Sequence, residues 1–279
     1  MYKLRLGFHA TFALKKEDLI KVLKVAKSEG LQYSTSVLSQ KTGLGMKKVT
    51  PMISWLTRGG LLCNRQLTPE GFEVLKHDPY LESPVTDWLI HFYLSFGNLP
   101  RQPLFLNPMP NDIFDLGGWS YFIFEFLPKH AHFSLDELAE KSSRIFSVHS
   151  VKHIRNNFKI LLRAYTDSYA LASCQIIKKV DSNTYATSTP TLPNNYIAAY
   201  MFSKLWERDV LHSETMALER LLDKRFGFLE VLASPDKSLW SHLEAMEKLK
   251  VISIHSEKPI QIRRSWSHPI SLLYNAYQV

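Results

Sequence analysis

LTPEGFEVLKHDPYLESPVTDWLIHF, residues 67–92, is the stretch of this chain that decides its expected fold. Within it, a helix starting at Pro84 carries a wide apolar stripe, and such a stripe has to be buried against other elements. The segment before it, Gly43–Leu62, is basic and is typical of the second half of a helix-turn-helix. Together the two segments predict a DNA-binding head joined to an apolar helical body.

The N-terminal part of the chain follows the element order of a winged helix. The spacing of its apolar residues predicts an amphipathic helix over residues 17–28. Ser34 or Ser36 is placed to cap a second helix that runs to about Lys41, and two glycines then form a tight turn. A third helix ends at a Gly-Gly pair and leads into a short strand. We therefore expect a winged-helix-like unit over residues 1–80.

The third helix has a polar face that suits DNA, because a helix fits the major groove and such side chains reach phosphates and base edges. The candidate contact residues are Lys47, Lys48, Thr50, Ser54 and Arg58. Pro51 is awkward here, since a proline inside a helix removes a backbone donor. Thr50 as N-cap, with Pro51 at the first helical position, shortens the helix and places Lys47 and Lys48 in the turn. The alternative is a winged helix that makes protein contacts only.

A second winged-helix-like unit is expected over residues 119–193. After an aromatic helix at residues 119–127, Ser134 and Glu137 form a capping box that starts one helix, and Ser150 caps a longer one. The outward face of the longer helix holds Lys152, Arg155, Lys159 and Arg163, with Asn156 beside them. This stripe contains no carboxylate, whereas faces that only meet solvent usually mix signs.

Two strands around residues 181–183 then predict a wing with Lys178 and Lys179 near its tip. We favour nucleic-acid contact for this second unit, and the alternative is a solvated basic face.

The remaining boundaries follow from proline content and from a third occurrence of the pattern. Residues 81–118 are expected to form a connecting helix and a Pro-rich loop, and residues 194–279 a third winged-helix-like unit. Its long helix, expected to be capped by Ser234 and started by Pro235, mixes charges outward, which favours a structural or partner-binding role. The expected fold class is mainly α with short β-hairpins, as tandem winged-helix-like units packed on a helical core.

Charge is concentrated where a polyanion would be contacted. The net charge is +8, and Lys and Arg outnumber Asp and Glu by 13 to 6 in residues 1–80 and by 8 to 5 in residues 131–190. No apolar run is long enough to cross a bilayer, and the N-terminus lacks a secretory signal. The 2 cysteines, Cys63 and Cys174, lie outside any CxxC spacing, so we expect reduced thiols in a cytoplasmic protein.

Catalytic motifs are missing from the sequence. It has no HExxH, no nucleophile elbow and no acidic cluster for a nuclease, and the GLGMKK segment lacks the ending of a phosphate loop. We therefore expect neither enzymatic activity, nor a cofactor, nor a metal. His9, near Thr11, is expected to be a buried imidazole bonded to backbone, and His91 a satisfied core residue.

Several motifs resemble the uncharacterised bacterial family labelled domain of unknown function four-thousand-seven. They are GFHATFAL at residues 7–14, GLGMKKVTPMISWL at 43–56, the opening block at 67–92, and PTLP at 190–193. The resemblance implies a winged-helix-like organisation and a genomic setting beside phosphoadenosine-phosphosulfate-reductase-like and other DNA-modification or phage-defence genes. It implies no activity. The chain departs from the family pattern after Tyr165, where an acidic stretch is usual.

Two functions are compatible with these features. The first is a DNA-binding protein of a phage-defence or phosphorothioation-type DNA-modification system, which contacts double-stranded DNA through its basic helices. The second is a protein adaptor in such a complex, bound to a neighbour-encoded enzyme and without direct DNA contact.

Overall fold

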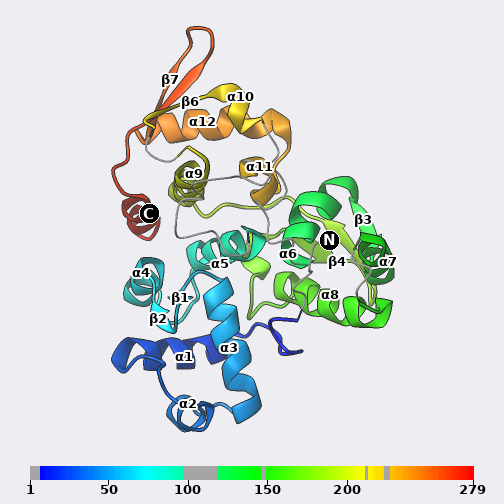
Figure 1. Ribbon diagram of the computed structural model, residues 1–279. Coiled ribbons are helices and arrows are strands. Elements are labelled where there is room, and N and C mark those ends of the chain that lie inside the picture. The colour runs from blue at the N-terminus through cyan, green and yellow to red at the C-terminus, as the bar shows by residue number, and fades with distance from the viewer. Residues whose placement is uncertain (1–6, 97–117, 146–148, 211–212, 223–226) are drawn as a thin grey trace. The chain divides into compact units, whose positions relative to one another are not determined.

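The computed structural model describes residues 7–96, 118–145, 149–210, 213–222 and 227–279 (Figure 1). The chain forms two compact units. Of the described residues, those up to 191 form one unit and those from 192 onward form the other. The Pro-rich loop expected in residues 97–117 lies outside the described residues.

Three helices and a hairpin open the first unit. The elements are α1 (Lys16–Ser28), α2 (Thr35–Thr42), α3 (Met46–Arg58), β1 (Leu62–Cys63), β2 (Gln66–Leu67) and α4 (Pro69–His77). The three predicted helices are confirmed, and they pack on one another. Ser34 caps α2, since its hydroxyl accepts the Val37 N–H at 3.4 Å. Gly43 ends α2 with a φ of 67°, which a residue without a Cβ adopts at little cost.

The start of α3 differs from its prediction. Gly45 is the N-cap and Pro51 lies inside the helix, so the expected cap at Thr50 is wrong. The N–H that Pro51 lacks would have bonded the Lys47 carbonyl, and the loss costs about 3 kcal/mol. Burying large side chains such as Trp55 and Leu56 stabilises by about 1.5–3 kcal/mol each, which is enough to keep the longer helix.

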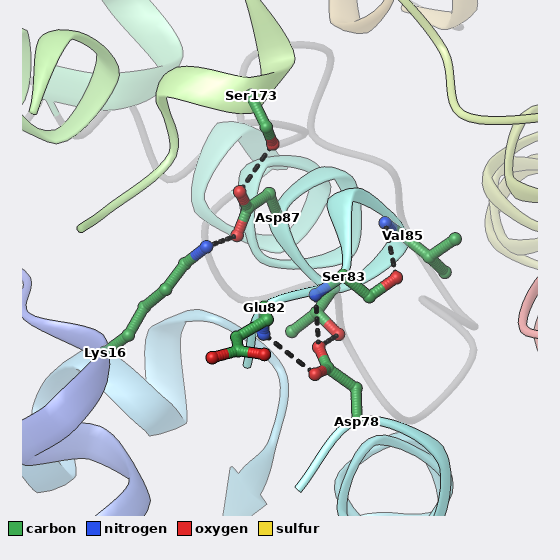
Figure 2. A network of polar contacts seen from close by, with 8 residues as sticks. Lys16, Asp78, Glu82, Ser83, Val85, Asp87 and Ser173 are labelled. Carbon is green, nitrogen blue, oxygen red and sulfur yellow. Dashed lines mark hydrogen bonds and ion pairs between the residues drawn. The ribbon is translucent and has the colours of Figure 1, made fainter. Parts of the chain in front are cut away.

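A buried carboxylate ties distant parts of the first unit together (Figure 2). Asp87, on α5 (Pro84–Phe96), is only 1% exposed. It forms an ion pair with Lys16 of α1 at 2.6 Å and accepts a hydrogen bond from Ser173 at 2.5 Å. Ser173 belongs to a short 3-10 helix, Ala172–Cys174. Burial raises the pKa of Asp87 to about 6, although Lys16 and Ser173 act in the opposite direction.

The turn before α5 is held by a second buried carboxylate, also visible in Figure 2. Asp78 accepts the backbone N–H of Glu82 at 2.8 Å and that of Ser83 at 3.0 Å. It also accepts the Thr86 hydroxyl at 2.5 Å. These bonds satisfy backbone N–H groups near the start of α5. Pro84 is the first residue of α5, a position where the missing N–H of proline costs no hydrogen bond.

His91 is a core residue, as expected. It is fully buried on α5, and its Nδ1 lies 2.6 Å from the hydroxyl of Tyr165. The same hydroxyl accepts the indole N–H of Trp119 at 2.7 Å. Both bonds are satisfied together when the Tyr165 hydroxyl donates to His91 Nδ1 and accepts from Trp119.

The aromatic segment is not the single α-helix that we expected, because it changes to a π-helix and then to a 3-10 turn. A short α6 (Gly118–Ser120) continues as a π-helix, Tyr121–Phe126, and then as a 3-10 turn, Leu127–Lys129. The Leu127 N–H bonds the carbonyl of Phe122, the i to i+5 spacing of a π-turn. Phe122 and Phe126 are both buried, with ring centroids 6.2 Å apart.

The first unit also contains a three-stranded antiparallel sheet with two helices beside it (Figure 1). The strands are β3 (His132–Ser134), β4 (Ile177–Lys179) and β5 (Thr184–Thr187), and their order in the sheet is β3-β5-β4. Between β3 and β4, the chain forms α7 (Leu135–Ile145) and α8 (Val151–Thr166), which pack against each other. Ser134 accepts the Glu137 N–H at 3.0 Å and Ser150 the His153 N–H at 3.3 Å. Both predicted caps, and the predicted hairpin, are confirmed.

The second unit has its own core and its own sheet. Its elements are α9 (Asn195–Asp209), β6 (Thr215–Ala217), α10 (Leu218–Leu221), α11 (Phe228–Val231), a 3-10 turn (Asp236–Ser238), α12 (Leu239–Lys248), β7 (Ile252–His255), β8 (Gln261–Arg264) and α13 (Pro269–Ala276). The sheet order is β6-β8-β7. Ser234 does not cap the long helix, because its hydroxyl donates to the Leu232 carbonyl and α12 begins only at Leu239.

The described residues are thus mainly helical, with small antiparallel sheets. No helix among them combines the length and the apolar character that a bilayer crossing requires.

Candidate nucleic-acid interface

Helix α8 aligns three of the predicted cations on one face. Arg155, Lys159 and Arg163 are spaced four residues apart, so they lie about 6 Å from one another along the helix. The opposite face, with residues such as Phe158 and Leu162, is buried. The cations are therefore held by a helix whose position the core fixes.

The β4–β5 hairpin adds a fourth cation to this face. Side chains alternate along a strand, so Lys178 and Lys179 point to opposite sides of the sheet. Lys179 pairs with Tyr185 in the antiparallel register, which puts both side chains on the same side. Lys179 and Tyr185 face α8, and Lys178 does not line the same space.

Between α8 and the hairpin lies a groove of about 450 Å³. Its lining includes Arg155, Lys159, Arg163, Asp167, Lys179 and Tyr185. Four cations and one carboxylate give this lining a formal charge of +3. We call it the α8 groove.

Carboxylates hold both arginines of the α8 groove in place. Arg155 forms an ion pair with Asp136 at the start of α7, and its Nη2 donates to Asn183 at 3.4 Å. The hydrogen bond from Arg155 is the main reason that the pKa of Asp136 is lowered. Arg163 donates to Asp167 at 3.0 Å and to the Tyr169 hydroxyl at 2.9 Å. Each guanidinium has five N–H donors, so these contacts orient it and leave donors for an anion.

The lysines of this region are less constrained. Among the described residues, neither Lys159 nor Lys179 has an ion-pair partner, and both are exposed. Lys152, Asn156 and Lys178 are exposed as well, but they lie outside the α8 groove. Of the seven residues predicted for this unit, four therefore line the α8 groove and three lie outside it.

Helix α3 uses its polar residues differently. Lys48 forms an ion pair with Asp18 of α1 at 2.5 Å, and Asp18 is only 6% exposed. The guanidinium of Arg58 lies 5.4 Å from the ring centroid of Phe8, a cation–π contact. Lys47 and Thr50 are exposed, and Ser54 is half-buried. Two of the three predicted cations of α3 thus contact the protein itself.

His9 lies against the aromatic residues of the same region. Its ring stacks on Trp55 with centroids 5.7 Å apart, and it is only 2% exposed. The expected backbone bond is not found at Nδ1, which has no hydrogen-bond partner among the described residues. Burial, and then the charge of His153, lower the pKa of His9 to about 4, so the imidazole is neutral at physiological pH.

Several residues in the α8 groove or in contact with its lining were not predicted from the sequence. Asp136 and Asp167 entered the prediction only through the net charge of residues 131–190, and no role was predicted for Tyr169 or Tyr185. The strand alternation was a usable signal, since it separates Lys179 from Lys178 and pairs it with Tyr185. The ion pair between Arg155 and Asp136 carried no such signal, because it joins different elements, whereas Arg163 and Asp167 are four residues apart and their pairing is local.

The described residues contain no cluster of side chains typical of a metal site. No three histidine, cysteine, aspartate or glutamate side chains in this part of the chain gather closely enough to hold a metal ion. Both cysteines are free thiols, and burial raises the pKa of Cys174.

Known structures share this fold. A crystal structure described as magnesium ion-bound SspB matches with a TM-score of 0.72 and 16% identity, covering 98% of this chain and 89% of that one. A second SspB crystal structure matches with a TM-score of 0.72 and 17% identity, covering 97% of this chain and 86% of that one. At such identities the likeness shows the fold alone. No curated protein sequence matches this chain.

The sequence itself places the chain in a family. Residues 7–265 match the family described as "Protein of unknown function (DUF4007)", and the chain belongs to it, as the sequence motifs led us to expect.

Proposed function

We propose that this member of the DUF4007 family is a DNA-binding protein of a bacterial phage-defence or DNA-modification system of the phosphorothioation type. Its main contact with DNA is the α8 groove. The cellular setting rests on the family resemblance, and free thiols at Cys63 and Cys174 fit a reducing cytoplasm.

The order of elements supports a winged-helix-like organisation of the DNA-binding parts. Helices α1, α2 and α3 followed by the β1–β2 hairpin, and strand β3 with α7, α8 and the β4–β5 hairpin, both follow the order of that motif. We assign residues 1–80 and 119–193 to two such units, residues 81–118 to their connection, and residues 194–279 to a third unit for partner contact.

The single observation that carries the proposal is the convergence of four cations on the α8 groove. Arg155, Lys159, Arg163 and Lys179 come from a helix and a hairpin that are separate in the sequence. Carboxylates offset part of the charge of the two arginines, so the remaining repulsion centres on Lys159 and Lys179, and an anionic partner reduces it. Phosphate contacts supply most of the affinity of DNA-binding proteins, so the site suits the DNA backbone.

Charge reversal at the centre of the α8 groove tests the proposal. Lys159→Glu should weaken binding to a labelled duplex at least about tenfold, since it replaces an attractive charge by a repulsive one next to the phosphates. Fluorescence anisotropy at fixed salt concentration measures the affinity. The matched control is Lys27→Glu, an exposed lysine on α1 without an ion pair among the described residues.

The two variants carry the same net charge, so a difference between them reports on position. Equal affinities of Lys159→Glu and Lys27→Glu would mean that the α8 groove is not the contact. A wild-type protein that binds neither duplex nor single-stranded DNA at low salt would remove the proposal altogether.

The adaptor hypothesis has one observation in its favour. Lys48 is paired with Asp18, and Arg58 lies on Phe8, so α3 offers fewer free charges than its sequence indicates. A winged helix with engaged cations suits protein contact. Copurification of the unaltered protein with a neighbour-encoded enzyme, together with no retention on immobilised duplex, would favour this second function.

A further inference from the structure

The hairpin limits what can approach the cationic face of α8. Asn183, in the turn between β4 and β5, accepts a hydrogen bond from Arg155 and donates one to Asp136 at 2.9 Å. The turn therefore reaches across the side chains at the N-terminal half of this face. A recognition helix enters a major groove about 12 Å wide with its side chains outward, and here the hairpin occupies part of that space.

The size of the α8 groove points the same way. About 450 Å³ lies within the range of roughly 300–1,000 Å³ that is typical of small-molecule pockets. A single nucleotide is a ligand of that size class. The groove can therefore enclose an unpaired nucleotide, whereas base-paired DNA contacts only its rim.

The inner wall carries a polar group that faces the groove without a partner. Tyr185 is 5% exposed, and its ring stacks on Phe133 with centroids 5.8 Å apart. Within the described residues its hydroxyl makes no hydrogen bond, and the residue lines the α8 groove. A phosphate oxygen is an acceptor that this hydroxyl, Lys159 and Lys179 can all reach as donors.

The rim of the groove carries an aromatic ring. Tyr169 is 40% exposed, and its hydroxyl donates to Asp167 at 2.7 Å and accepts from Arg163 at 2.9 Å. Both partners line the α8 groove, so the ring is fixed at its edge. Lys15 lies 5.5 Å from the ring centroid. A charged groove beside a fixed aromatic ring is the combination with which proteins bind single strands.

We propose that the α8 groove binds a single-stranded segment of DNA, with one backbone phosphate among Lys159, Lys179 and Tyr185 and the adjoining base stacked on Tyr169. This inference rests on the proposed function, because it specifies the form of DNA that the groove accepts. Duplex then binds through its gaps or its opened stretches more strongly than through intact base-paired regions.

The test compares two labelled probes on the full chain by fluorescence anisotropy. One is an oligothymidylate of about 12 nucleotides, within the usual site sizes of single-strand binders, and the other is a blunt duplex of the same length. We expect the single strand to bind at least about tenfold more tightly at equal salt, because its bases are free to stack.

Two substitutions separate stacking from general charge. Tyr169→Leu should weaken single-strand binding about tenfold, the usual loss of one stacking platform, and change blunt-duplex binding less than about twofold. The matched control is Tyr80→Leu, since Tyr80 is also exposed and also has a lysine, Lys24, 5.7 Å from its ring centroid. Tyr185→Phe should weaken single-strand binding about threefold, because it removes one hydrogen bond to the phosphate.

The outcomes distinguish this inference from the proposed function. Equal affinity for both probes, or a Tyr169→Leu variant that behaves like Tyr80→Leu, overturns the single-strand inference and leaves DNA binding in place. Binding to neither probe overturns both. Thermal unfolding of each variant shows whether a lost affinity reflects a lost fold.

Discussion

Helices α3 and α8 carry nearly the same sequence pattern but use it in different ways. Each has polar residues at one-turn spacing on its outward face, with cations among hydroxyl groups in α3 and cations throughout in α8. In α3, Lys48 pairs with a nearly buried carboxylate and Arg58 lies on an aromatic ring. In α8, the carboxylates orient the arginines at the mouth of a groove, and Lys159 lies between them without an ion pair to any described residue. The burial of the carboxylate, rather than the number of cations, decides whether a basic helix is available to a ligand.

The largest expected difference between the two helices is in DNA affinity. We expect Lys159→Glu combined with Lys179→Glu to weaken duplex binding by about 100-fold, since two phosphate contacts are each replaced by repulsion. Lys47→Glu, on the exposed part of α3, should weaken it less than about threefold. Anisotropy titrations at several salt concentrations measure both. If Lys47→Glu costs as much as the double variant, the two helices are equivalent and the comparison fails.

The second prediction concerns His9, which contacts α3 and senses the charge of His153 on α8. Its pKa is lowered from the ordinary 6.5 to about 4, so its contribution to stability is present above pH 6.5 and is lost as the pH falls through 4. Between pH 7.5 and 5 the wild type should lose about 2 kcal/mol of unfolding free energy relative to His9→Gln. Urea titrations at both pH values measure this difference.

A constant difference between the two proteins would show that His9 titrates normally. In that case the aromatic packing around it is looser than its burial indicates.

The third prediction separates structural cations from ligand-binding ones. Among the described residues, Lys48→Met leaves the carboxylate of Asp18 with Lys21 alone, at 3.9 Å. The substitution should lower the free energy of unfolding by about 1 kcal/mol. Lys159→Met should change it by less than about 0.5 kcal/mol, because that side chain is exposed. Chemical denaturation of both variants gives the two values. An equal loss in both would contradict the assignment of Lys48 to the fold.

The smallest expected effect comes from removing the ion pair between Arg155 and Asp136. Asp136→Asn removes the carboxylate that shares the charge of Arg155, so duplex affinity should rise about two- to threefold. Asp18→Asn on the α3 side should leave affinity unchanged, since Lys48 is turned toward α1. Weaker DNA binding by Asp136→Asn would mean that the orientation of Arg155 matters more than its net charge.

The local features of the first unit followed well from sequence. Hydroxyl caps at Ser34, Ser134 and Ser150 and the hairpin around residues 181–183 depend on neighbouring residues, and the structure confirms them. The start of α3 did not follow, because the buried apolar face of the helix outweighs the local effect of Pro51.

The candidate site was predicted less completely than the helices around it. The stripe on α8 was visible as a spacing of like charges, and the α8 groove holds three of its members. The role of Asp136 was not visible, because it contacts Arg155 and Asn183 from a different element. The contacts of Asp167 and Tyr169 with Arg163 are local, but the sequence did not show that they border a groove. Contacts between elements depend on how helices and strands pack, which a single sequence does not encode locally.

The bridge from Asp87 to Lys16 and Ser173 has a consequence for how the N-terminal region can be used. Its three residues come from stretches that are far apart along the chain, so the bridge closes only after most of the first unit has been synthesised. A fragment that stops near residue 80 keeps its basic helix but loses the anchor of α1. Residues 1–80 are therefore expected to be unstable when they are fused to another protein without the rest of the first unit.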